Sequence, residues 1–144
     1  VKLLKEALAI VEKLEDSRAE QATTLTNLAL LYFKLDKAKK AAAALNEALR
    51  IFEEEGNAEE TDAHYSAALA GVGEAYYRMG DYANSLASYE KALIEVEKHF
   101  GKNQSYGVLC ENCAAVCSSL KEEEKAEAYR KQAQEIYRKI NSEK

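Results

Sequence analysis

The chain has 144 residues, of which 47% are hydrophobic and 31% charged, and it contains no proline and six glycines. Its formal net charge is −5, and because nucleic-acid binders usually carry a basic face, we predict no nucleic-acid partner. No apolar run approaches the ~20 residues of a membrane span, so we predict no membrane partner either.

Alanine, leucine, glutamate and lysine dominate the composition, and these residues favour helices. No alternating run of β-branched residues bounded by turn residues predicts a strand. The predicted fold class is therefore all-α.

The first predicted element spans residues 1–16, which begin in helical pattern as VKLLKEALAI. Its KEALAIVE matches NEALRIFE at Asn46, 41 residues later. We expect a partial repeat that contributes only its second helix, cut from a longer protein. Leu4 and Leu8 match Leu45 and Leu49, which predicts apolar surface that permits self-association through this helix.

Three full units of two helices each follow. The first, 17–57, is predicted to form helices over 19–35 and 37–54 around a turn at Asp36-Lys37, with Gly56 after the second helix. The second, 58–101, is predicted to form helices over 62–79 and 82–99 around Gly80-Asp81. Thr61 or Asp62 is expected to cap the first of these, and Gly101 to follow the second.

The third unit, 102–144, is predicted to form helices over 104–120 and 122–141 around Lys121-Glu122, with Asn103 or Ser105 as N-cap. Its last helix places Arg130 and Gln134 where earlier units have large apolar residues. Terminal repeats need a polar outer face, so this helix is interpreted as a C-terminal cap.

The units align without gaps from Asn27, Gly71 and Asn112, at offsets of 44 and then 41 residues. Small residues recur at the same places: Ala29, Gly73 and Ala114; Ala41, Ser85 and Ala126; Ala48, Ala92 and Ala133. This ordering of small and large residues resembles the tetratricopeptide repeat, and the long period resembles the repeats of kinesin light chains. HEAT and armadillo arrays have comparable periods, but the small-residue ladder argues against them. The resemblance implies one domain over 1–144, a right-handed α-α superhelix of about seven helices with one continuous core.

All three cysteines lie in CENCAAVC, residues 110–117, a C-x2-C-x3-C spacing that also suggests a metal or thiol site. The alignment places Cys110, Cys113 and Cys117 where the other units have large apolar side chains. Their i, i+3, i+7 spacing is one helix face, and a structural zinc site normally needs a fourth ligand. We predict buried thiols, no metal and no cofactor, in a reducing cytoplasm.

No pattern in the chain indicates catalysis. The carboxylates cluster in FEEEGNAEETD and KEEEKAE, at helix ends and linkers, and no glycine-rich phosphate loop is present. His64 lies near a helix start and His99 at a helix end. We predict that the protein is not an enzyme.

In the fold that the resemblance implies, the first helix of each unit lines a concave groove. The residues placed there by register include Asn27, Leu30, Lys34, Glu74, Tyr77, Arg78, Glu111 and Asn112. Asn27 and Asn112 match an asparagine that kinesin-light-chain-like repeats use to hold a peptide backbone amide. Gly71 interrupts that series in the second unit. Of the five places that match a chaperone carboxylate clamp, Thr26, Leu30, Gly71, Val108 and Asn112, none is cationic, so we predict no such clamp.

The predicted function is a non-catalytic scaffold that binds a protein or peptide partner in this groove. Alternatives are the ligand-sensing segment of a larger bacterial peptide-responsive regulator, or a helical array with a metal or thiol site at the cysteines. Metal analysis of the purified protein distinguishes the last of these from the others.

Overall fold

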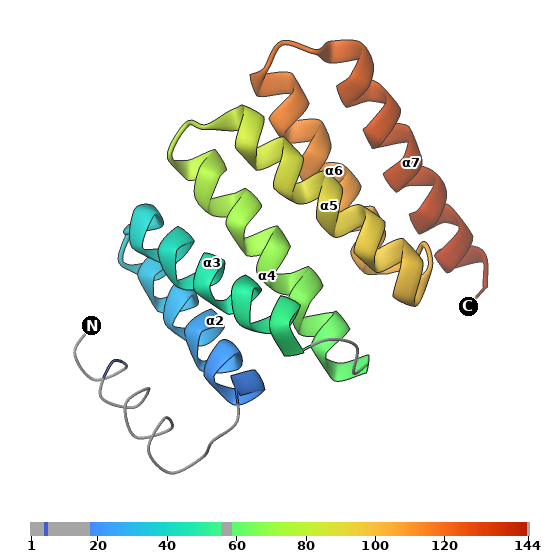
Figure 1. The fold of residues 1–144 in the computed structure, drawn as a ribbon. Helices are drawn as coiled ribbons and strands as arrows, with labels where there is room; N and C mark the ends of the chain where they lie inside the picture. The colour runs from blue at the N-terminus through green and yellow to red at the C-terminus, as the bar shows by residue number, and fades with distance from the viewer. Residues whose placement is uncertain (1–4, 6–17, 56–58, 144) are drawn as a thin grey trace.

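A computed structural model describes residues 5, 18–55 and 59–143. Within them the chain forms six α-helices and no strand. They are α2 (Arg18–Lys34), α3 (Ala38–Glu55), α4 (Glu59–Arg78), α5 (Tyr82–Phe100), α6 (Gln104–Ser119) and α7 (Glu123–Ser142). The helices stack as consecutive antiparallel pairs along one array, from α2 and α3 at one end to α6 and α7 at the other (Figure 1). This is the predicted all-α, right-handed superhelix, with two helices to each unit.

Most helix bounds agree with the sequence-based prediction to within one or two residues. The exception is α4, which begins at Glu59 instead of 62. Thr61 and Asp62 therefore lie inside the first turn, and the prediction that one of them caps the helix is wrong. Asn103 does cap α6, because its side chain accepts a hydrogen bond from the backbone N–H of Tyr106 at 3.0 Å. Apart from Lys5, which is helical, the predicted helix over 1–16, with its exposed apolar face, lies outside the described residues, as does Gly56.

The turn within each unit has the same backbone geometry. Its central residue has a positive φ of 57° at Asp36, 81° at Gly80 and 63° at Lys121. The next N–H returns to the carbonyl five residues earlier, from Lys37 to Tyr32, Asp81 to Tyr76 and Glu122 to Cys117, at 2.8–2.9 Å. These bonds form the Schellman motif, which satisfies carbonyls left over at a helix end. The residues that the 44- and 41-residue alignment matches therefore make the same backbone hydrogen bond in all three turns.

Helices α2, α4 and α6, the A helices, approach one another directly. Arg78 of α4 donates to the carbonyl of Phe33 in α2 at 3.2 Å, and the hydroxyls of Tyr77 and Ser119 in α6 are 3.2 Å apart. Helices α3, α5 and α7, the B helices, are bridged by long side chains, as where Lys91 lies 3.6 Å from Glu53.

The fully buried residues form two clusters. One is built from α2, α3 and part of α4, and the other from α4 to α7. Half-buried Leu49 and Tyr65 pack against both clusters. The expectation of one uninterrupted core is wrong for the fully buried residues, because α4 turns Val72 toward one cluster and Leu69 toward the other.

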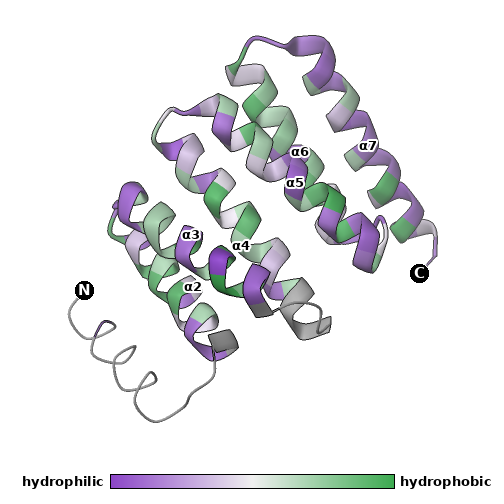
Figure 2. Ribbon diagram, in the orientation of Figure 1, coloured by the Kyte–Doolittle hydropathy of each residue, from purple (hydrophilic) through white to green (hydrophobic). Residues whose placement is uncertain are grey.

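Hydropathy differs between the two helices of the last unit. Helix α6 is pale to hydrophobic along most of its length, whereas α7 is largely hydrophilic (Figure 2). Helix α7 buries only a narrow stripe at Ala126, Ala133 and Ile136. At the two places where we predicted a polar outer face, Gln134 is exposed and Arg130 is half-buried. In the described part of the chain no helix has the length and apolar character that crossing a membrane requires.

Candidate binding face and its pocket

The cysteine-rich stretch lies in the interior of α6. Cys110, Cys113 and Cys117 are free thiols, each with 0% of its surface exposed, so the predicted burial is confirmed. Burial raises the pKa of the Cys110 thiol to about 11 and raises that of Cys113 further. A thiol that keeps its proton is a poor nucleophile and metal ligand. Among the described residues, no group of three or more histidine, cysteine or acidic side chains is placed to hold a metal ion.

The A helices leave an uncovered face, which we call the A-helix face. It carries the exposed or half-buried residues Asn27, Leu30 and Lys34 on α2, Ala67, Glu74, Tyr77 and Arg78 on α4, and Val108, Glu111, Asn112 and Ala115 on α6. Leu30, Tyr77 and Val108 expose 56%, 37% and 44% of their surface, large fractions for apolar or aromatic side chains. One such side chain therefore comes from each A helix.

The polar residues predicted for this face differ in their surroundings. Arg78 forms an ion pair of 2.8 Å with Glu74, stacks over the ring of Phe33 and donates to the Phe33 carbonyl. Lys34, at the matching place on α2, is exposed. Arg78 is thus held by its own chain, and Lys34 is the more accessible cation for an acidic group of a ligand.

Glu111 lies at the edge of the A-helix face nearest α7. Its carboxylate accepts a hydrogen bond from the Tyr137 hydroxyl of α7. Burial, and then this hydrogen bond, raises the pKa of Tyr137 to about 12, the direction expected for a phenol that donates to a carboxylate. The bond orients the Glu111 carboxylate toward α7.

The three residues of the interrupted asparagine series also differ. Asn27 is exposed on α2, and Asn112 is half-buried between α4 and α6. Gly71 packs against Leu45 of α3, so closely that a Cβ there would lie 2.8 Å from Leu45 Cδ1. An asparagine at this place would require the Leu45 side chain to move.

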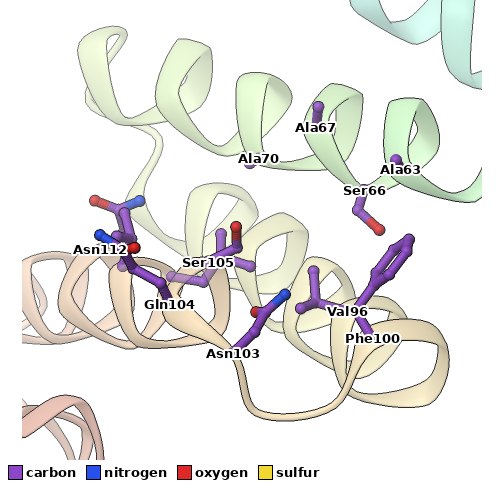
Figure 3. A pocket seen from close by; sticks show the side chains of 12 residues that line it. Ala63, Ser66, Ala67, Ala70, Val96, Phe100, Asn103, Gln104, Ser105 and Asn112 are labelled. Atoms are coloured by element: carbon purple, nitrogen blue, oxygen red, sulfur yellow. The ribbon is translucent and has the colours of Figure 1, made fainter. Parts of the chain in front are cut away.

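A pocket of about 550 Å³ opens on the A-helix face between α4 and α6, with the end of α5 as its floor (Figure 3). Helix α4 contributes Ala63, Ser66, Ala67 and Ala70, and α5 contributes Val96 and Phe100. The α6 side is formed by Asn103, Gln104, Ser105, Val108, Leu109 and Asn112. Among the lining residues whose side chains the structure describes, none is charged. The pocket is a size that takes small molecules or single side chains.

Of the pocket residues, sequence reasoning placed Asn112 in the groove and gave Ser66 and Phe100 no functional role. Ser66 falls at a buried place of α4. The alignment contains an indication that the polar side chain of Ser66 is unusual at its place. The matching residues in the other units are Ala22 and Gly107, neither of which has a polar side chain.

The chain is similar in sequence to a known protein family and in fold to several solved structures. A family model described as tetratricopeptide repeat matches residues 1–54 and 56–139. A comparison with curated proteins gives no match.

Several solved structures have the same fold. BtubC (BKLC) from P. vanneervenii is 24% identical with a TM-score of 0.84, over 97% of this chain and 56% of that protein. The apo form of RapI is 21% identical with a TM-score of 0.84, over 96% of this chain and 37% of that one. A putative kinesin light chain repeat protein from Podosopora anserina is 17% identical with a TM-score of 0.76, over 96% and 66%. The chain thus spans little more than half of BtubC and about a third of RapI.

Proposed function

Because the chain belongs to the tetratricopeptide repeat family, we propose that it is a non-catalytic scaffold that binds an extended or helical segment of a partner protein along the A-helix face. The observation that supports this most directly is the exposure of Leu30, Tyr77 and Val108, one from each A helix, on the face that the B helices leave uncovered. Exposed apolar side chains that share one face of a domain typically mark an interaction surface.

Polar groups on the same face suit a peptide ligand. Asn27 and Asn112 each offer an amide that can both donate and accept, which matches a peptide group withdrawn from water. Lys34 adds a cation at one end of the face, and Glu74 and Glu111 add acidic groups. This mixture favours a ligand of mixed charge.

A peptide library displayed on phage and selected against the 144-residue chain tests the proposal. A selected peptide should bind the Asn27→Ala/Asn112→Ala variant about thirtyfold more weakly, since two hydrogen bonds of about 1 kcal/mol each are lost. The melting temperature should be nearly unchanged, because neither side chain belongs to the buried core. Isothermal titration calorimetry and thermal unfolding measure the two quantities.

A matched control removes two exposed amides from B helices, Asn46→Ala with Gln134→Ala, and should leave the affinity intact. If the control pair weakens binding and the Asn27/Asn112 pair does not, the site lies on the B-helix face and the proposal is wrong.

The alternative, a sensing segment of a larger peptide-responsive regulator, would use the same face. The likeness to RapI shows a shared fold at 21% identity, and the regulatory role remains a prediction. In either role we propose a cytoplasmic protein, because three buried free thiols suit a reducing compartment.

A further inference from the structure

The pocket between α4 and α6 contains a buried polar atom with no partner. The side chain of Ser66 is 94% buried, with 6% of its surface exposed, and its Oγ forms no hydrogen bond with any residue that the structure describes. Figure 3 shows this hydroxyl directed from α4 toward Phe100, into the space that the pocket residues enclose. Leaving a buried hydroxyl without a partner is unfavourable, because the group has lost its hydrogen bonds to water.

Packing within the chain does not explain this hydroxyl. The same place holds Ala22 in the first unit and Gly107 in the third, and Ala22 is fully buried there. Alanine therefore satisfies the helix packing at this place. Ser85, a fully buried serine of α5, shows the usual outcome, because its Oγ donates to the Gly73 carbonyl at 2.6 Å.

The rest of the pocket restricts what can bind beside Ser66. Its α4 wall is made of Ala63, Ala67 and Ala70, which leave room for a flat group against the helix. Phe100, 43% exposed, adds the edge or face of an aromatic ring, and aromatic rings favour offset or edge-to-face contacts with one another. None of the lining residues whose side chains the structure describes could pair with a carboxylate or phosphate, and a buried unpaired charge is unfavourable.

We propose that this pocket receives a tyrosine side chain of the partner segment, with the phenol hydroxyl hydrogen-bonded to Ser66 Oγ. Tyrosine has an apolar ring with a single polar atom at its tip, which matches apolar walls with one deep hydroxyl. Both hydroxyls can donate and accept, so either direction of the bond satisfies Ser66. The polar side chains of Gln104, Ser105 and Asn112 on the α6 side can meet the peptide backbone that carries the ring. The inference rests on the proposed function, since it names one side chain of the ligand on the A-helix face.

The test uses small probes on the 144-residue chain, followed by amide chemical shifts in NMR titrations. p-Cresol represents the tyrosine side chain, p-xylene has the same shape without the hydroxyl, and p-tolyl phosphate carries a charge at the tip. p-Cresol should shift the amides of 63–70 and 105–112, and Ser66→Ala should weaken its binding about three- to tenfold. p-Xylene should bind both proteins equally, and p-tolyl phosphate should not bind.

Two further variants complete the test. Ser105→Ala removes a hydroxyl from the rim of the same pocket and should leave p-cresol binding unchanged. Ala67→Phe fills the pocket from its exposed α4 wall and should abolish binding of both uncharged probes. Ser66→Ala should fold normally, because Ala22 occupies the matching place, and circular dichroism verifies this.

Equal affinity of p-cresol for the native chain and Ser66→Ala, or shifts confined to other residues, would overturn the inference. A selected peptide that binds the A-helix face without any tyrosine, while p-cresol fails to bind, would refute the tyrosine pocket and leave the proposed function intact. p-Cresol binding as described, together with no peptide binding to that face, would refute the proposed function instead.

Discussion

At the scale of single residues, Gly73 shows how the small places of the repeat are matched to their neighbours. A Cβ at this residue would lie 2.9 Å from ring atoms of Tyr89, which packs directly on the α4 backbone. The first unit combines alanine with leucine at these two places, as Ala29 and Leu45. A larger residue on α5 is thus accommodated by a smaller one on α4.

This pairing predicts a strong coupling between the two residues. Gly73→Ala should destabilise the native chain, because overpacking costs about 1–3 kcal/mol and exceeds the gain of up to about 1 kcal/mol in helix propensity. In a Tyr89→Leu background the same substitution should stabilise by up to about 1 kcal/mol. Urea unfolding of the four proteins in this double-mutant cycle measures the coupling. An equal effect of Gly73→Ala in both backgrounds would contradict the prediction.

The buried thiols predict a pH dependence of stability. Burial raises the pKa of Cys110 from 9.0 to about 11, so between these pH values the unfolded thiol loses its proton while the folded one keeps it. The unfolded state then binds fewer protons, and stability falls as pH rises. Relative to Cys110→Ala, the native chain should lose of the order of 1–2 kcal/mol between pH 8 and 11. Urea midpoints measured in reductant test this, and parallel pH profiles for the two proteins would contradict it.

At the scale of helices, the starts of α5 and α7 differ at one matching place. Asp81 caps α5 by accepting a hydrogen bond from the Asn84 N–H at 3.3 Å. Glu122 occupies the same place before α7 and makes no side-chain cap bond. Glutamate is one methylene longer than the preferred capping residues, and α7 therefore begins with an uncapped turn.

Replacing Glu122 by the residue found in the second unit should correct this. Glu122→Asp should raise the free energy of unfolding by about 0.5–1 kcal/mol, since a good N-cap typically contributes that much. The reciprocal control, Asp81→Glu, should lower it by a similar amount while keeping the charge. Thermal and urea unfolding measure both. If Glu122→Asp is neutral while Asp81→Glu destabilises, another feature must already stabilise the start of α7.

At the scale of the whole molecule, the two clusters of buried residues predict incomplete cooperativity. They meet at partly buried Leu49 of α3 and Tyr65 of α4. In repeat arrays each unit contacts only its neighbours, so stability is a sum of unit and interface contributions. A thin boundary between clusters lets one end open before the other.

Leu49→Ala should separate the unfolding of the two clusters. All three cysteines belong to the cluster built from α4 to α7, so thiol labelling in urea reports that end, whereas far-ultraviolet circular dichroism reports all helices. In Leu49→Ala the dichroism should begin to fall at lower urea than labelling begins. Ile94→Ala, an exposed site on α5, is the control and should not separate the two probes. Coincident transitions in Leu49→Ala would show that the boundary does not limit cooperativity.

The sequence by itself determined the features that depend on neighbours along the chain. The 44- and 41-residue alignment predicted the turns at Asp36, Gly80 and Lys121, because a helix end is set by hydrogen bonds within a few residues. It also predicted the burial of Cys110, Cys113 and Cys117, because their spacing selects one helix face. The sequence-based prediction failed at the start of α4. The capping preference of Thr61 and Asp62 was outweighed there, and the helix begins at Glu59.

The tertiary structure alone decided what depends on the distance between units. Gly71, which interrupts the asparagine series, lies against Leu45 of another helix, so a larger residue there would require Leu45 to move. Arg78 is engaged by Phe33 of α2, and Glu111 by Tyr137 of α7. The pocket at Ser66 exists because α4, α6 and the end of α5 leave space between them. Repeat register fixes which face a residue occupies, but only the packing of three helices fixes whether that face is filled or open.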